Sequence, residues 1–348
     1  MSKTKLLVSL ALFALTGIIG AQELGIKAKK PVFGGACKTC PWGAMADVVK
    51  AAMQPYGYDV QVCYNCSGAD STRIVAGAKM PPPVEEFWRR SPELRNQILA
   101  PPAGPVDFGA TASHFLWNAY QGKGVYKAEP ARTNLRLIAE IQSPTYLIVA
   151  ARSELGITDL RQIKEKRWPV RIITSVGDQA VQVLAYYGLS REVVESAGGH
   201  IGAGSSEAER KNFDIAIGEG VLVNAPEWNM WYEISQTYRL HYLDLPEDLL
   251  TKFAKEQDME RKTLPLGMLR GLDRPIPTVA HRGIAVYGRT DTPADFAYTV
   301  AKALDEQQDL LQWGPLNFSY NRTAVWKAYG VPLHPGAARY YREMKYMK

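Results

Sequence analysis

The chain closes with the run Val331-Pro332-Leu333-His334-Pro335-Gly336-Ala337-Ala338-Arg339-Tyr340-Tyr341. Prolines and a glycine occupy its first half, and these residues are the strongest local interruptions of regular structure. Its second half is basic and aromatic, and a proline just before it is typical of a helix start. The run therefore predicts a turn followed by a short helix at the C-terminus.

Strands and helices are predicted to alternate through the preceding sequence. Residues 135–141 and 146–151 are the strongest strand candidates because they are rich in β-branched side chains. Residues 293–308 form the clearest helix candidate, with apolar residues repeating on one face. This pattern predicts an α/β fold with a parallel sheet covered by helices. The Gly-rich run 198–204 follows no predicted strand and is interpreted as a loop.

The first residues have the organisation of a secretory signal. Lys3 and Lys5 precede the apolar stretch 6–20, which is short for a bilayer span, and Ala21 is a small residue suited to cleavage. Residues 1–21 are therefore predicted to be a signal peptide that directs the chain to the periplasm. An uncleaved membrane anchor is the alternative.

Length and charge restrict the function classes. A chain of 348 residues is long enough for two core-forming domains. Its 41 basic and 35 acidic residues are scattered, which does not support nucleic-acid binding. The sequence contains no HExxH, G-x-S-x-G, Walker or dinucleotide-binding motif, so no enzyme class and no cofactor is indicated.

Four cysteines form two CxxC pairs, Cys37 with Cys40 and Cys63 with Cys66. Structural disulfides, within or across the pairs, fit an oxidising compartment. The overall spacing C-x2-C-x22-C-x2-C also approaches that of a four-thiolate metal site, and thiol redox chemistry is a third interpretation. All three interpretations remain open at this point.

Several stretches together resemble the TAXI-type solute-binding proteins that serve TRAP transporters. The closing Leu333-His334-Pro335-Gly336 is the most specific of them. The others are Gly34 to Gly43, Cys66 to Thr72, Val106 to Gly109, Leu135 to Ala150, and Pro277 to Tyr287. They cover most of the chain after the signal.

The resemblance implies a two-lobed, periplasmic-binding-protein-like α/β fold of type II, with a ligand cleft between the lobes. Lobe I would combine residues 28–150 with 278–348, and lobe II would be residues 151–277. The Pro-bracketed residues 77–105 read as a helical insertion within lobe I, either a docking or covering element or a surface decoration. The implied function is non-catalytic capture of a small organic anion, a dicarboxylate or amino acid, for TRAP-type permease subunits.

The candidate ligand residues are mostly small and polar, and lie in loops that follow predicted strands, where open α/β sheets bind ligands. They are Thr39, Trp42, Asn65, Ser67, Ser71, Ser113, Thr174, Ser175, Gly177 and Glu219. Glu219 would favour a ligand with an amine or hydroxyl group. Arg136 and Arg282 are candidates for binding a ligand carboxylate, with a structural ion pair as the default for each, and His281 is similarly ambiguous. The alternative function is a periplasmic metal-binding or thiol-redox protein that uses the four cysteines.

Overall fold

The chain divides into two compact units, each described here by itself. Unit 1 comprises residues 1–142 and 283–348, and unit 2 comprises residues 143–282. The computed structural model describes residues 25–35, 41–63, 66, 68–77, 106–175, 179–204, 206–220, 230–257, 259–312 and 319–347. The predicted signal peptide and the 77–105 insertion fall almost entirely outside these residues. Within them, no helix is long and apolar enough to cross a membrane.

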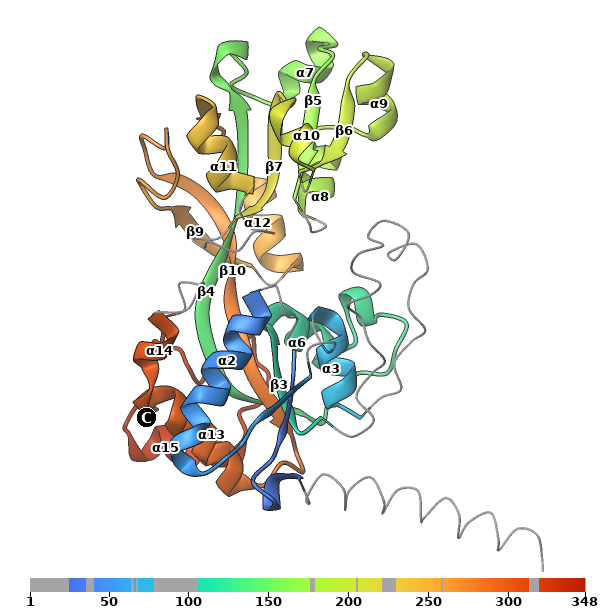
Figure 1. Ribbon diagram of the computed structural model, residues 1–348. Helices are drawn as coiled ribbons and strands as arrows, with labels where there is room; N and C mark the ends of the chain where they lie inside the picture. The colour runs from blue at the N-terminus through green and yellow to red at the C-terminus, as the bar shows by residue number, and fades with distance from the viewer. Residues whose placement is uncertain are drawn as a thin grey trace, which may run out of the picture. The chain divides into compact units, whose positions relative to one another are not determined.

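Unit 1 combines elements from both ends of the chain, blue and orange-red in Figure 1. Two long strands, β4 (Leu135–Arg152) and β10 (Ile276–Arg289), contribute to both units. The remaining named elements of unit 1 are β1 (Val32–Gly34), α2 (Pro41–Met53), β2 (Gln61–Cys63), α3 (Gly68–Val75), β3 (Phe108–Ala112), α6 (Ser113–Gln121), α13 (Ala294–Glu306), α14 (Gln308–Gln312) and α15 (Pro335–Glu343).

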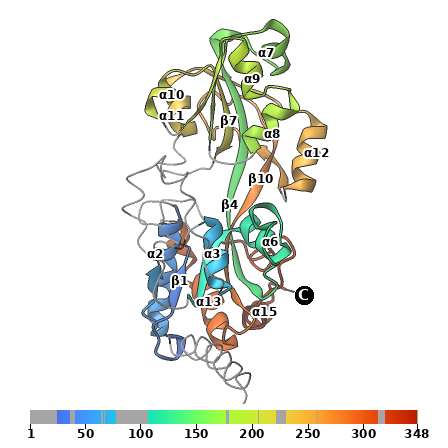
Figure 2. The ribbon, with the colours of Figure 1, turned by 90° about the vertical axis from the view of Figure 1, so that its right-hand side faces the viewer.

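Unit 2 is built from the middle of the chain. In Figure 2, α11 lies on one side of its sheet and α8 and α12 lie on the other. Its elements are α7 (Arg161–Lys166), β5 (Arg171–Thr174), α8 (Gln179–Tyr186), α9 (Arg191–Ser196), β6 (His200–Ala203), α10 (Glu207–Lys211), β7 (Ile215–Gly220), α11 (Met230–Thr237), β8 (Leu240–Tyr242), α12 (Glu247–Glu256) and β9 (Glu260–Leu264).

The predicted α/β class is confirmed, but the sheet is mixed and not purely parallel. In unit 1, β1 pairs parallel with β2 and β3, and β10 runs antiparallel to β3. In unit 2, β5 pairs parallel with β6 and β7, while β4 runs antiparallel to β7 and β8. The parallel expectation holds for β1 with β2 and β3 and for β5 with β6 and β7, and it was wrong for β4, β8, β9 and β10.

The strand β4 merges two predicted strands into one. Residues 135–141 and 146–151 belong to a continuous strand of 18 residues. Within unit 2, Tyr146 and Ile148 enter one apolar core, and Leu147 and Val149 enter the other. Successive side chains of a strand point to opposite faces, so both faces of β4 are buried there. This explains the unbroken apolar run in the sequence.

The glycine-rich run 198–204 was wrongly interpreted as a loop, because it contains β6. Gly199 has no room for a side chain, since a Cβ there would lie 2.4 Å from the carbonyl oxygen of Val170. Gly199 thus permits the chain entering β6 to approach the chain entering β5 closely, and β6 pairs with β5 from Arg171↔His200 to Thr174↔Ala203. A glycine-rich strand lacks the β-branched signal on which strand prediction depends.

The closing motif forms the predicted turn and helix. His334 is the N-cap of α15: its Nδ1 accepts a hydrogen bond from the Gly336 amide at 3.1 Å, and its Nε2 lies 3.0 Å from the Thr292 carbonyl oxygen. A Cβ on Gly336 would lie 1.9 Å from the carbonyl oxygen of Ala294 in α13. The motif therefore serves to pack α15 tightly against α13 within unit 1.

Candidate functional site

Polar side chains gather where β5 and β7 end in unit 2. The chain leaves β5 at Thr174, and the Ser175 hydroxyl accepts a hydrogen bond from the backbone amide of Glu219 at 2.7 Å. Gly218 makes this possible, because a Cβ there would lie 2.0 Å from the Ser175 oxygen. The structure thus brings together three residues that the sequence predicted as ligand contacts, Thr174, Ser175 and Glu219.

The Glu219 carboxylate contacts His281 of β10 within unit 2. Its Oε1 lies 3.2 Å from Nε2 of His281, and these residues are only 8% and 4% exposed. Burial disfavours the charged imidazolium and lowers the pKa of His281 to about 4. At neutral pH the imidazole is uncharged, so this contact places a hydrogen-bonding group, and not a positive charge, beside the carboxylate.

Gln179, the first residue of α8, completes the cluster. Its Nε2 lies 3.1 Å from His281 Nε2 and 3.2 Å from Gln257 Oε1. The residue is 8% exposed, and its Oε1 has no hydrogen-bond partner in the part of the chain that the structure describes. We call Ser175, Gln179, Glu219 and His281 the unit 2 polar cluster.

The predicted contacts Ser71 and Ser113 lie in unit 1, and both are fully buried. The Ser71 hydroxyl donates to the Ala110 carbonyl oxygen at 3.1 Å and lies 2.5 Å from the Tyr287 hydroxyl. The Ser113 hydroxyl contacts the Glu140 carboxylate at 2.8 Å. Both hydroxyls therefore have internal partners in the unit 1 core.

Other predicted contacts lie outside the described residues, namely Thr39, Asn65, Ser67 and Gly177, as do the cysteines Cys37 and Cys40. Trp42 is the second residue of α2.

Cys63 and Cys66 form a disulfide at the end of β2, with Cα atoms 5.6 Å apart. Both are buried in the unit 1 core. As a disulfide this pair offers no thiolate to a metal ion. Within the described residues, no group of three or more His, Cys, Asp and Glu side chains is arranged to hold a metal.

The two arginines proposed for a ligand carboxylate make local contacts. Arg282 forms an ion pair with Glu260 of β9, with Nε 2.6 Å from Oε1. The Arg136 guanidinium donates to the carbonyl oxygens of Thr133 and Leu135, each at 2.7 Å. These contacts agree with the structural alternative for each arginine.

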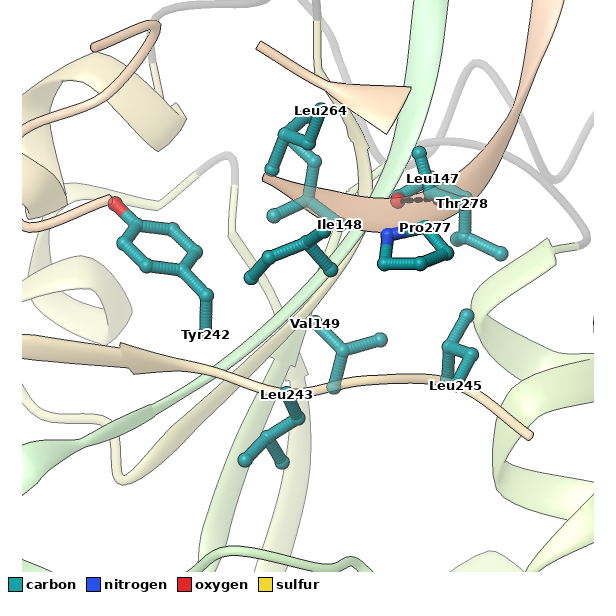
Figure 3. Close-up of a pocket in the computed structure, with 10 residues that line it drawn as sticks. Leu147, Ile148, Val149, Tyr242, Leu243, Leu245, Leu264, Pro277 and Thr278 are labelled. Atoms are coloured by element: carbon teal, nitrogen blue, oxygen red, sulfur yellow. Dashed lines mark hydrogen bonds between the residues drawn. The ribbon is translucent and has the colours of Figure 1, made fainter. Parts of the chain in front are cut away.

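Two of the cavities in the described part of unit 2 lie away from the polar cluster and are not lined by its residues. Figure 3 shows the smaller, which holds about 10 Å³ among apolar side chains around β4, where the Thr278 hydroxyl donates to the Leu147 carbonyl oxygen at 2.5 Å. It has room for about one water molecule. The larger, about 200 Å³, lies between α7 and α9 and includes Lys164 and Arg167. Both helices end near the amino ends of β5 and β6, at the opposite edge from Glu219.

The sequence missed Gln179 and Glu140 as members of these polar groups and left His281 ambiguous. Gln179 is the first residue of helix α8 and Glu140 lies in the predicted strand 135–141, and polar residues in such elements are usually solvated. The sequence offered one signal, for Glu140: an acidic residue inside the apolar run 135–141 indicates a buried carboxylate, and such a group needs hydrogen-bond partners. No local pattern connects Glu219 with His281, which lie in different strands.

The chain is similar in structure to several solute-binding proteins. A TctC solute-binding protein from Polaromonas, solved without ligand, is 12% identical with a TM-score of 0.45, over 91% of this chain and 99% of its own. The substrate-binding domain of a putative molybdenum ABC transporter from Clostridium difficile is 9% identical with a TM-score of 0.35, over 84% and 99%. A polar amino acid ABC uptake transporter substrate-binding protein from Streptococcus thermophilus is 11% identical with a TM-score of 0.32, over 84% and 89%.

These structural likenesses are loose, and the family assignment comes from the sequence. A family model described as NMT1-like matches residues 98–344, which is more than two thirds of the chain and includes residues of both units. The chain therefore belongs to the NMT1-like family, which comprises solute-binding proteins of the tripartite tricarboxylate or Bug type.

Proposed function

We propose that this chain is a periplasmic, non-catalytic receptor that captures a small organic anion, a dicarboxylate or amino acid, for a TRAP-type transporter. Family membership across residues 98–344 is the observation that carries the solute-binding role. The TRAP-type partner is supported by the closing Leu333-His334-Pro335-Gly336 and its likeness to TAXI-type proteins.

The polar residues at the carboxyl ends of strands support the same role. Loops and helix starts that follow parallel strands are the usual ligand positions in open α/β sheets. In unit 2, Thr174 ends β5 and Ser175 follows it, and both are partly exposed, while Glu219 lies near the end of β7. We propose that these residues contact the solute. We propose the same role for Ser71 and Ser113, which follow strands β2 and β3 of unit 1. Thr39, Trp42, Asn65, Ser67 and Gly177 complete the proposed set.

The alternative function, metal binding or thiol redox through two CxxC pairs, has less support. Cys63 and Cys66 are joined and buried, with Cys66 fully inaccessible. A reactive thiol must be reached by its partner, and a metal site needs thiolates. The disulfide instead links the end of β2 to the segment just before α3, which is a structural role.

Native mass spectrometry of protein purified from the periplasm without reduction tests the proposal. A receptor should carry a small organic molecule, lack residues 1–21, and weigh less than the fully reduced chain because of its disulfides. Titration of ligand-free protein with dicarboxylates and amino acids, followed by calorimetry, should then give a dissociation constant without turnover. Protein that carries zinc on reduced cysteines and binds no solute would contradict the receptor role.

A further inference from the structure

One cavity of unit 2 combines an apolar floor with two basic side chains. It holds about 200 Å³ between α7 and α9, near the amino ends of β5 and β6. We propose that this cavity binds a compact monocarboxylate with an apolar body, of about the size of benzoate, and that Lys164 and Arg167 hold its carboxylate. The site is independent of the proposed receptor function, because it lies at the opposite edge of the sheet from Glu219.

The floor of the cavity is formed by core side chains. Ile163 of α7, Leu189 and Val194 of α9 line it, and they are only 2%, 0% and 1% exposed. All three belong to one buried apolar cluster of unit 2, so the surrounding core holds the floor in place. A dry cavity of about 150 Å³ with such a lining binds benzene. This cavity therefore has room for an aromatic ring or a short aliphatic chain that carries one small substituent.

The two basic side chains line the same cavity on its exposed side. Lys164 lies in α7 and Arg167 follows the end of that helix, and both are exposed. The Lys164 ammonium lies close to Gly188, where an added Cβ would be 3.1 Å from Nζ. None of the described residues that line the cavity is acidic. An anion whose apolar body rests on the floor would therefore meet positive charge at the mouth.

Both basic side chains are available to a ligand. Within the part of unit 2 that the structure describes, neither the Lys164 ammonium nor the Arg167 guanidinium has an ion pair or a hydrogen bond. Most other basic side chains of the unit do pair with an acidic neighbour, as Arg171 does with Asp214 at 2.6 Å. A carboxylate can accept hydrogen bonds from a guanidinium and an ammonium together, since it has about four lone-pair sites.

The helix ends beside the cavity do not need these cations. Carbonyl groups at the end of a helix attract positive charge, and both α7 and α9 end here. The backbone amide of Arg167 already donates to the carbonyl oxygens of Ile163 and Lys164, and the amides of Ala197 and Gly198 close α9 in the same way. Each helix has only six residues, so few aligned peptide dipoles act at its end.

The experiment follows the cavity itself by NMR of the purified protein with labelled methyl groups. The reporters are the methyl signals of Ile163, Leu189 and Val194. The probe is benzoate, titrated at pH 7 beside two matched compounds. Benzamide keeps the ring and removes the charge, and acetate keeps the charge and removes the ring.

Three variants and one control assign the interaction to residues. Lys164→Gln and Arg167→Gln each remove one charge from the mouth. Ala197→Leu places a larger side chain in the cavity lining without altering its charge. Lys255→Gln is the matched control, because Lys255 is an exposed lysine of α12 and lies outside that lining.

Benzoate should shift the three methyl signals and bind more tightly than benzamide or acetate. Lys164→Gln and Arg167→Gln should each weaken benzoate binding roughly 3- to 5-fold, as expected for an exposed ion pair, and leave benzamide unchanged. Added salt should weaken the binding of benzoate to wild type but not that of benzamide. Ala197→Leu should weaken both ring compounds, and Lys255→Gln should change none of these affinities.

Three outcomes would overturn the inference. If benzoate binds without shifting the cavity methyls, its site is elsewhere, and the receptor function stands without a second site. If benzoate and benzamide bind equally, the cavity accepts a ring but does not recognise the carboxylate. Unchanged benzoate affinity in both Lys164→Gln and Arg167→Gln would remove the basic side chains from the site. Circular dichroism should show that each variant is folded, and if one is not, the comparison of benzoate with benzamide on wild type decides.

Discussion

Replacement of Gly336 by alanine should undock the C-terminal helix. The Cβ would lie 1.9 Å from the Ala294 carbonyl oxygen, 2.8 Å from its carbon and 3.0 Å from the Tyr298 amide nitrogen, and all three are backbone atoms that cannot rotate away. Real Cβ atoms essentially never come within 3.0 Å of such a neighbour, so α15 must move by more than an ångström. Overpacking of this kind typically costs about 1–3 kcal/mol.

The displacement would also strain the hydrogen bonds that α15 makes to the rest of unit 1. Tyr341 donates to the Ile138 carbonyl oxygen at 2.9 Å, and Tyr340 donates to the Asp305 carboxylate at 2.7 Å. Each buried hydrogen bond contributes about 1 kcal/mol. We therefore expect Gly336→Ala to lower the free energy of unfolding by about 3 kcal/mol. In a unit of this size the melting temperature should fall by about 6–12 °C.

Thermal unfolding followed by circular dichroism measures this change, and Gly57→Ala is the matched control. Gly57 is also in unit 1 and has a φ of 78°, and a Cβ added there would have no atom within 4 Å. Alanine at this position meets left-handed backbone strain without a clash, which costs about 1 kcal/mol. If Gly336→Ala melts no lower than Gly57→Ala, close packing of α15 on α13 is not what the glycine provides.

Three further predictions concern buried groups. His281 has a pKa of about 4 in the folded chain against 6.5 when free, so the unfolded chain binds more protons than the folded chain as the pH falls from 6.5 to 4. Urea titrations should therefore show that the free energy of unfolding of unit 2 falls by about 3 kcal/mol over this range. His281→Gln should remove that fall. Burial raises the pKa of Asp107 to about 6 from 3.8, so its contribution has the opposite sign: it is fully present below 3.8 and lost as the pH rises through 6. Asp107→Asn, which can still accept from the Val32 amide, should raise stability at pH 7 by up to about 3 kcal/mol and have little effect at about pH 3.5. Reduction of the Cys63–Cys66 disulfide should lower the free energy of unfolding by about 2 kcal/mol, because the bridge closes only a short loop. The test uses a chain in which the other two cysteines are replaced by serine, and compares urea titrations of its oxidised and reduced forms. A difference near zero would refute a stabilising role for the disulfide.

Local sequence signals predicted much of the secondary structure. The α/β class, the strands around residues 135–151 and the helix after Pro293 follow from side-chain periodicity and β-branched composition, which act over a few residues. These signals failed for glycine, which occurs both in loops and where two strands approach closely. Gly199 belongs to a glycine-rich run that usually marks a loop, but here it lets the chain entering β6 lie against the backbone of Val170, and its role depends on that neighbouring backbone.

The candidate site was only partly predictable for the same reason. Ser175 and Glu219 could be proposed from their places just after predicted strands, since ligands collect at the carboxyl ends of strands. Their partners could not, because His281 approaches Glu219 from β10 and Gln179 approaches His281 from α8. Pairing in the sheet sets these contacts, and the intervening sequence carries no record of it.

Side-chain periodicity was enough to predict the α/β class, and a sequence match over residues 98–344 was enough to assign the NMT1-like family, because both are properties of the chain and need no tertiary contacts. Tertiary structure alone decided what the motifs do. The closing His334-Pro335-Gly336 caps a helix and lets it pack against a backbone carbonyl of α13. Burial likewise turns His281 into a neutral partner for Glu219, since the cost of removing a charge from water depends on what surrounds it in the fold.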